Sequence, residues 1–255
     1  MKTSQCIIVF SLFVLLSFLT VNENVAAQKS YPNFLGDDVY DTDSLDDDES
    51  REMNISDPLE PLNRVFFEFN DVFYEWLLKP VTDGYMWVFP LELRQSFGNF
   101  FFNIAMPIRL LNSLLQGDLE QSGVVVQRFL INSTLGVYGF ADIADVEFGI
   151  KPTRADFAQT LGKWGMGEGI YLCWPVIGPS SVRGSLGLVV DAYSHPVPYF
   201  HDSQAFEVSY YSTYRVNRLS LNPDAYEDLK RFAVDPYVAS RQAYYEYRNA
   251  MLLRD

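Results

Sequence analysis

The chain has 255 residues, a formal net charge of −14 and two cysteines. This charge argues against nucleic acid as a partner, because phosphate binding requires a basic surface. It also disfavours attraction to anionic lipid head groups, so any membrane contact must come from buried apolar area. The length suffices for one substantial domain.

The first residues are typical of an export signal. An apolar run from Ile7 to Leu19 follows a short positive region, and Val25-Ala26-Ala27 supplies small residues for cleavage after Ala27. We therefore predict a signal peptide over residues 1–27. An uncleaved anchor is less favoured, because the run falls short of the roughly 18 apolar residues that a spanning helix needs.

The two cysteines limit how the mature chain is held together. Cys6 precedes the apolar run, so it cannot be a lipoprotein cleavage cysteine, which should follow that run. Cys173 is then the only cysteine left after cleavage, and no intramolecular disulfide can form. Stability must come from packing.

Residues 28–55 are predicted to be a disordered linker. Between residues 37 and 52 the chain carries nine acidic residues against one arginine. Such a block cannot bury enough apolar surface to offset the entropy lost on ordering. One folded helical domain is expected over residues 56–255.

The folded part opens with a helix signal. Asp57-Pro58-Leu59-Glu60 places Asp at the N-cap, Pro at N1 and Glu at N3 of a capping box. Apolar residues then recur at helical spacing as far as Leu77, and Lys79-Pro80 is expected to end the helix. The stripe fits either a buried core helix or a helix partly in lipid.

Helices are also expected over most of the remaining chain. They are predicted over residues 91–105, 108–115, 118–134, 138–148, 204–221, from 222 and over 235–253. Gly162 to Gly187 mixes glycine and proline with apolar and aromatic residues, which predicts an irregular, non-helical segment. Residues 189–200 also read as irregular. No segment shows sustained period-two alternation, so the predicted fold class is all-α.

Catalytic and metal chemistry finds little support. The two histidines, His195 and His201, are too few for a zinc site without further ligands. Ser194 and Asp191 lie near His195 in sequence, but adjacency is not the geometry of a hydrolytic triad. The glycines at 165, 167 and 169 neither follow a predicted strand nor open a helix, as a phosphate loop would. We expect no enzyme, no catalytic residue, no cofactor and no metal.

Ordered motifs over residues 56–250 resemble the MlaA/VacJ family of outer-membrane lipid-asymmetry proteins. The motifs are Asp57-Pro58-Leu59-Glu60-Pro61-Leu62-Asn63-Arg64, Phe69-Asn70, Asn99-Phe100-Phe101-Phe102-Asn103, Leu111-Asn112-Ser113-Leu114-Leu115-Gln116-Gly117, Arg128-Phe129-Leu130-Ile131-Asn132, Asp156-Phe157-Ala158-Gln159-Thr160-Leu161-Gly162, Gly178-Pro179-Ser180 and Asp235-Pro236-Tyr237.

The resemblance implies a ring of helices lying in the periplasmic leaflet of the outer membrane. In such a protein an amphipathic channel lets mislocalised phospholipid leave the outer leaflet. An MlaC-like periplasmic lipid carrier takes the phospholipid onward, and a trimeric porin holds the ring. The resemblance implies an exported protein that lies at the periplasmic face of the outer membrane and contacts the inner leaflet of that membrane.

Two further expectations concern residues. The residues expected in the lipid channel or in membrane contact are Phe66, Phe69, Phe73, Trp76, Trp164, Gly165, Gly167, Tyr171, Trp174, Pro175 and Gly178. Bulky replacements at Gly165 or Gly178 are expected to disturb lipid movement before they unfold the protein. The chain departs from the family in lacking a lipobox cysteine, and in having Gly184 where an acidic residue usually follows the arginine at 183, which puts a local ion pair in doubt.

Two alternatives stay open. The first is a soluble periplasmic lipid-binding module, which the missing acyl anchor suggests. The second is a hydrolase that uses His195 or His201.

Overall fold

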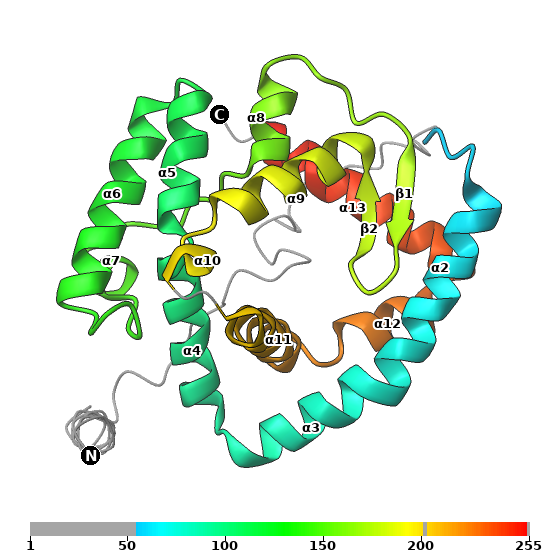
Figure 1. Cartoon of the computed structure of the whole chain (residues 1–255), viewed down its shortest axis with the longest axis horizontal. Coiled ribbons are helices and arrows are strands. Elements are labelled where there is room, and N and C mark those ends of the chain that lie inside the picture. Colours follow the sequence, from blue (N-terminus) through cyan, green and yellow to red (C-terminus); the bar gives the residue numbers. More distant parts are fainter. Residues whose placement is uncertain (1–54, 201–202, 254–255) are drawn as a thin grey trace, which may run out of the picture. The chain divides into compact units, whose positions relative to one another are not determined.

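Helices make up most of the structure, with a short β-hairpin among them (Figure 1). The computed structural model describes residues 55–200 and 203–253, which belong to one unit spanning Phe34–Asp255. The predicted signal peptide, its cleavage site, the acidic linker up to residue 54 and His201 lie outside the described residues. The predicted all-α class is confirmed, and the hairpin is an addition to it.

The elements follow in chain order. They are α2 (Glu60–Phe73), the π-helix η3 (Tyr74–Leu78), α3 (Lys79–Val88), α4 (Leu91–Ile104), α5 (Met106–Leu115), α6 (Leu119–Thr134), α7 (Ile143–Val146), α8 (Phe157–Lys163), β1 (Tyr171–Trp174), β2 (Gly178–Ser181), α9 (Val182–Ser194), α10 (Val197–Phe200), α11 (Gln204–Leu221), α12 (Ala225–Phe232) and α13 (Pro236–Leu253).

The first helix runs on past the proline that was expected to end it. A π-helical turn, η3, joins α2 to α3, and Pro80 falls in the first turn of α3. A proline is tolerated there because the first amides of a helix have no intrahelical acceptor. The prediction that the helix stops at Lys79-Pro80 is therefore wrong.

The predicted capping box is also wrong. The N-cap of α2 is Leu59, which makes no side-chain cap hydrogen bond. The Asp57 carboxylate instead accepts hydrogen bonds from Asn63 (2.8 Å), Arg241 (2.8 Å) and the Tyr237 hydroxyl. It joins the start of α2 to α13, a contact between distant parts of the chain.

Several helix predictions are confirmed. The helices expected over residues 91–105 and 118–134 are α4 and α6, and the one expected over 108–115 is α5, which begins two residues earlier with Pro107 in its first turn. The Asp118 carboxylate caps α6 by accepting from the Gln121 N–H at 2.8 Å. Helices α11 and α13 match their predicted ranges, whereas the helix expected over residues 138–148 shrinks to α7. Val137 and Tyr138 have φ values of 51° and 58°, and this left-handed backbone cannot continue a helix.

The glycine-rich segment is more regular than predicted. Strand β1 pairs antiparallel with β2, with Tyr171 opposite Ser181 and Trp174 opposite Gly178. Helix α9 begins at residue 182 and, with α10, covers most of residues 189–200. Both irregular predictions are therefore wrong over most of their length. Four-residue strands are too short to show an alternation in sequence.

Contacts between the elements form a closed circuit. It runs from α2 to β1 and β2, then to α9, α8, α5, α4, α11 and α3, and returns through η3. The ring-like arrangement expected from the resemblance agrees with this circuit. A small hydrophobic cluster of Tyr171, Cys173, Tyr237 and Tyr245 lies where α13 meets the hairpin.

Buried side chains are polar as often as they are apolar in the described residues. Carboxylates neutralise the inward arginines: Asp142 pairs with Arg128 at 2.7 Å and Asp156 with Arg248 at 2.7 Å. Buried charges persist in proteins when they are paired and hydrogen-bonded. Hydrogen bonds and ion pairs therefore hold together much of the interior of this fold.

Asp191 is part of this polar interior and links α9 to α5 and α8. Its carboxylate accepts from Asn112 Nδ2 at 3.0 Å and from the Phe157 N–H at 3.0 Å. Burial raises the pKa of this carboxyl to about 6, although both hydrogen bonds act in the opposite direction.

We expect Asp191 to make the fold less stable as pH rises from about 4 to about 6. The folded protein holds this proton more tightly than the unfolded chain, where the pKa is about 3.9, so stability falls across that window. Between pH 4 and pH 7 the variant Asp191→Asn should gain about 2–3 kcal/mol relative to wild type. Urea unfolding in a non-ionic detergent measures this, and a pH-independent difference would contradict it.

Candidate functional site

One face of the first helical stretch is apolar and exposed. Leu62, Val65, Phe69, Val72 and Trp76 follow at steps of three and four residues, and all five are exposed, Trp76 by 83%. Such steps place side chains on one side of a helix. We call these five residues the outer stripe. For this face the buried-core interpretation is wrong.

The opposite face of α2 carries the contacts that hold it. Asn63 is buried; its Nδ2 donates to the Tyr171 carbonyl at 3.1 Å and its Oδ1 accepts from the Cys173 N–H at 2.9 Å. Phe66 and Phe67 pack against the hydrophobic cluster. The helix therefore fixes itself to β1 by one face and presents its apolar stripe on another.

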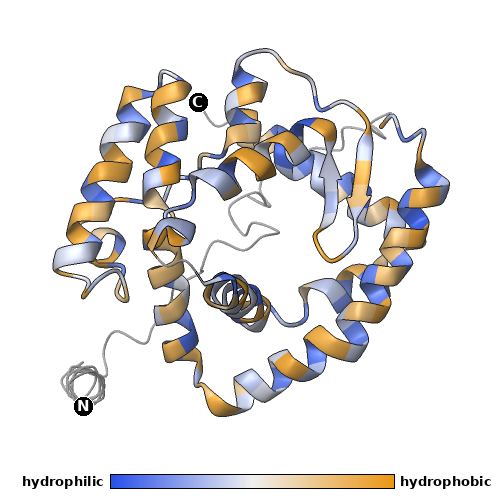
Figure 2. Ribbon diagram, in the orientation of Figure 1, coloured by the Kyte–Doolittle hydropathy of each residue, from blue (hydrophilic) through white to orange (hydrophobic). Residues whose placement is uncertain are grey.

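Exposed apolar residues continue on other helices, and Figure 2 shows hydrophobic positions spread along α5, α6 and α9 as well as α2 and α3. Examples are Trp87, Val88, Leu111, Leu114, Leu119, Phe129, Leu130, Leu186, Val189, Tyr193 and Phe200. Apolar exposure on this scale marks an interaction surface. Within the described residues, no helix combines the length and the apolar character that crossing a bilayer requires.

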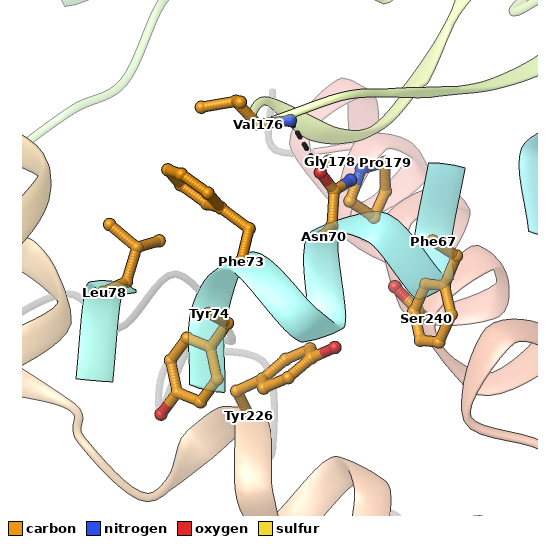
Figure 3. Close-up of a pocket in the computed structure, with 10 residues that line it drawn as sticks. All are labelled: Phe67, Asn70, Phe73, Tyr74, Leu78, Val176, Gly178, Pro179, Tyr226 and Ser240. Carbon is orange, nitrogen blue, oxygen red and sulfur yellow. Dashed lines mark hydrogen bonds between the residues drawn. The ribbon is translucent and has the colours of Figure 1, made fainter. Parts of the chain in front are cut away.

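A pocket of about 120 Å³ lies between α2, η3 and the hairpin turn (Figure 3). Its lining comprises Phe67, Asn70, Phe73, Tyr74, Leu78, Val176, Gly178, Pro179, Tyr226 and Ser240. Sites for drug-sized ligands typically have roughly 300 Å³ or more, so this pocket is too small to enclose a lipid. It can hold only part of an apolar chain.

Asn70 fixes the hairpin turn above this pocket. Its Oδ1 accepts from the Val176 N–H at 2.6 Å, and its Nδ2 donates to the Trp174 carbonyl at 2.9 Å. Val176 has a φ of 67°, which is costly for a β-branched residue. The turn is thus held in an unfavourable conformation by a side chain from α2.

The structure divides the predicted site residues from α2 and η3 by location. Phe69 and Trp76 belong to the outer stripe. Phe73 lines the pocket, and Phe66 packs against the hydrophobic cluster. These aromatic residues therefore face different surroundings.

The predicted residues of the hairpin also separate. Gly178 lines the pocket, and Pro175 lies in the turn beside Trp174. Trp174 is 40% exposed, and its indole N–H donates to Ser185 Oγ at 2.8 Å. Tyr171 is fully buried in the hydrophobic cluster, so it cannot contact lipid in this structure.

Trp164, Gly165 and Gly167 form a separate group at the end of α8. Trp164 is 58% exposed, and its indole N–H donates to the Leu115 carbonyl at 3.1 Å. Asn70, Tyr74, Leu78 and Trp87 were not among the predicted residues. Trp87 was missed because the helix was expected to end before it, although its place among apolar neighbours was visible in sequence.

Arg183 has an ion-pair partner after all. It is buried and pairs with Glu168, whose other oxygen accepts from Ser181 Oγ at 2.5 Å. The doubt raised by Gly184 is therefore resolved by an acid that lies earlier in the chain. A side chain at 184 would meet the Tyr244 hydroxyl 2.3 Å from its Cβ, which explains the glycine.

Alanine at Gly178 is expected to destabilise the protein through its backbone alone. Gly178 has a φ of 96°, and nothing lies within 4 Å of a Cβ built there. The left-handed conformation costs an L-residue about 1–2 kcal/mol. Gly167 has the same open space without a left-handed φ, so Gly167→Ala is the matched control and should stay within about 0.5 kcal/mol. Equal urea midpoints for the two variants would contradict this. The expected effect of bulkier side chains at Gly165 and Gly178 on lipid movement stays a prediction.

The histidine hypothesis finds no triad at His195. The Asp191 carboxylate is engaged by Asn112 and Phe157, and His195 Nδ1 accepts from the Val197 N–H at 3.3 Å. Among the described residues there is also no cluster of three or more potential metal ligands.

Comparisons with known proteins fit this picture. A family model described as "MlaA lipoprotein" matches residues 55–251, nearly the whole described part of the chain. The chain belongs to the MlaA lipoprotein family. The resemblance read from the sequence motifs is confirmed.

Relatives of this MlaA family member include named transport proteins. A Haemophilus influenzae protein named "Intermembrane phospholipid transport system lipoprotein MlaA" is 31% identical over 197 residues, 75% of this chain and 77% of that protein. The Escherichia coli protein of the same name is 30% identical over 195 residues, 75% and 76% of the two chains. An uncharacterised Rickettsia conorii protein is 27% identical over 240 residues, covering 94% and 93%.

The fold is similar to a solved structure described as "Structural basis for maintenance of bacterial outer membrane lipid asymmetry". The TM-score is 0.68 at 26% identity, over 77% of this chain and 99% of the other.

Proposed function

We propose that this protein takes part in intermembrane phospholipid transport and helps to maintain the lipid asymmetry of the outer membrane. In this proposal it removes mislocalised phospholipid from the outer leaflet through an amphipathic channel. It passes the lipid to a periplasmic carrier of the MlaC type, while a trimeric porin holds it at the periplasmic face of the membrane. The names of its relatives support the transport role.

The observation that carries the proposal is the outer stripe. Its five apolar residues are exposed on a helix whose other face is fixed by buried polar contacts. In water this arrangement would leave large apolar side chains unburied, whereas one leaflet of a membrane solvates them. The stripe therefore supports a protein sunk into a leaflet through apolar contact.

The double variant Trp76→Ser with Trp87→Ser tests the membrane contact. These side chains are 83% and 88% exposed, so their loss should change the free energy of unfolding by less than about 1 kcal/mol in total. Each buries on the order of 200 Å² when it enters lipid, so binding to phospholipid vesicles should fall by at least about tenfold. Vesicle co-sedimentation measures this.

The control for this double variant removes charge from the same helices. Glu68 on α2 and Asp83 on α3 are exposed, and Glu68→Ser with Asp83→Ser should leave vesicle binding within about twofold of wild type. Release of the wild-type protein from membranes by high salt or alkali without detergent would contradict the proposal and favour a soluble periplasmic lipid-binding module. Phospholipid that co-purifies with the protein, identified by mass spectrometry, would support it.

A further inference from the structure

Arg109 on α5 is an inward-facing cation without a carboxylate partner in the described part of the chain. Its Nη1 donates to the Phe102 carbonyl at 2.6 Å, and its guanidinium lies 3.7 Å from the centre of the Phe102 ring. Its remaining N–H groups donate to no described atom, and they are not sealed from solvent. The Phe102 ring and carbonyl hold the guanidinium in place and leave donors available.

The three fully buried arginines of the described residues are neutralised. Arg128 pairs with Asp142, Arg183 with Glu168, and Arg248 with Asp156. A buried charge costs several kcal/mol unless something compensates it, which is the usual reason for such pairs. The half-buried Arg94 has no carboxylate partner among the described residues either, but it donates to two carbonyls, those of Phe89 and Ser220, whereas Arg109 donates to one. The chain carries an excess of 14 negative charges, so a shortage of acids does not explain the missing partner of Arg109.

The surroundings of Arg109 are positive and rich in hydroxyl groups. Burial and repulsion from Arg154 and Arg128 lower the pKa of Arg109 to about 10, so it stays charged at neutral pH. Although burial opposes it, Arg218, Arg109 and Arg154 together lower the pKa of the Tyr214 phenol. The field at this point therefore favours negative charge.

The charge of Arg109 acts on side chains of two further elements, because it contributes to the lowered pKa of Tyr214 on α11 and to that of His195 after α9. Phe101 precedes Phe102 on α4. The centre of its ring lies 5.2 Å from that of Tyr210 and 5.5 Å from that of Tyr214, both on α11. The His195 ring, which follows α9, lies 5.5 Å from Tyr210. Because His195 Nδ1 accepts from a backbone N–H, the neutral ring carries its proton on Nε2 and can donate.

We propose that Arg109, flanked by His195 and Tyr214, binds the phosphate group of a phospholipid. Arginine forks match phosphate oxygens in a bidentate manner, and a phosphate diester would supply the negative charge that the fold does not provide. This proposal rests on the proposed function for the identity of its ligand. The tetrahedral phosphate chemistry is shared by a lipid head group and by free phosphate, and the experiment separates them.

The test measures binding to the purified full-length chain in dodecyl maltoside by calorimetry. The probes are dihexanoyl-phosphatidylglycerol, dihexanoylglycerol, which lacks the phosphate, and inorganic phosphate. Arg109→Gln should weaken phosphatidylglycerol binding by about tenfold, equivalent to about 1.4 kcal/mol, and leave dihexanoylglycerol binding unchanged. Arg109→Lys should lose less, because it keeps the charge but not the fork.

Arg231→Gln is the matched control, because Arg231 is exposed and also lies over a phenyl ring, that of Phe232 at 5.6 Å. It should bind all three probes as wild type does. If Arg109→Gln does not fold, the variants Arg109→Lys and Tyr214→Phe replace it in the test. For each of them the affinity for dihexanoyl-phosphatidylglycerol is divided by the affinity for dihexanoylglycerol. A ratio equal to that of wild type in both variants overturns the proposal.

The remaining outcomes separate this proposal from the proposed function. Unchanged phosphatidylglycerol binding in a folded Arg109→Gln variant overturns the phosphate site and leaves lipid transport standing. Binding of inorganic phosphate that depends on Arg109, without binding of either lipid, overturns the lipid assignment and contradicts the proposed function.

Discussion

Replacing Asp57 by alanine is expected to lower the free energy of unfolding by about 3–5 kcal/mol, because it removes a buried carboxylate and leaves Arg241 with only the more distant Glu60, at 3.7 Å. The side chain of Asp57 is 3% exposed and that of Arg241 is 17% exposed, with 2.8 Å between Oδ2 and Nη1. The same carboxylate accepts from Asn63 and from Tyr237. Its loss would release the start of α2 from α13. Urea unfolding monitored by circular dichroism in a mild detergent measures the change.

Asp118 supplies the control for Asp57. Its carboxylate makes a true helix cap with the Gln121 N–H at 2.8 Å, so Asp118→Ala should cost only about 1 kcal/mol. If both variants lost the same small amount, Asp57 would be a local cap after all. A larger loss for Asp57 supports its role as an anchor between distant elements.

The variant Asp142→Asn is expected to cost a similar 3–5 kcal/mol. Both Asp142 oxygens accept from Arg128 Nη2, at 2.8 and 2.7 Å, and the Arg128 side chain is 1% exposed. Asp142 also accepts from Asn132 Nδ2 at 3.0 Å, which ties α6 to the start of α7. An amide can keep one acceptor but leaves the charge of Arg128 unneutralised.

A surface ion pair nearby provides the comparison for Asp142. Lys151 lies 3.0 Å from Asp145 and is 81% exposed, so Lys151→Ala should change stability by less than about 1 kcal/mol. The double variant Arg128→Met with Asp142→Asn should recover part of the lost stability, because no unpaired charge remains. A double variant less stable than the sum of the two single losses would contradict this account.

Local signals were enough to predict most helices. The helices expected over residues 118–134, 204–221 and 235–253 are present, within one residue of those bounds, as α6, α11 and α13. The chemistry of these ends lies within a few residues of sequence. The same holds for the helical periodicity of the outer stripe, whose position on one face was visible before its exposure was known.

Features that depend on distant residues could not be predicted in this way. Asp57 fits a capping box locally, but its carboxylate accepts hydrogen bonds from Arg241 and Tyr237, which lie near the other end of the chain. The hairpin depends on Asn63 and Asn70 of α2, which hold its backbone from outside. The residues near Pro80 give no signal in sequence that a π-helical turn precedes it and that the helix continues past it.

The candidate site shows the same division. Periodicity placed Phe69 and Trp76 on one stripe, but periodicity alone does not distinguish a stripe facing a core from one facing lipid. Tyr171 looked like part of a lipid surface because of its aromatic and glycine-rich neighbours. It is buried instead, because β1 packs between α2 and α13. Arg109 carried no sequence signal, since its lack of an acidic partner appears only in three dimensions.

The outer-leaflet phospholipid content of cells that lack this protein tests the central claim most directly. Labelling of surface-exposed phospholipid should rise on deletion and return to the normal level when the wild-type chain is restored. It should stay high with the variant Trp76→Ser and Trp87→Ser, which folds but loses its apolar membrane contact. An outer leaflet whose phospholipid content is the same with and without the protein would contradict the proposed role in lipid transport.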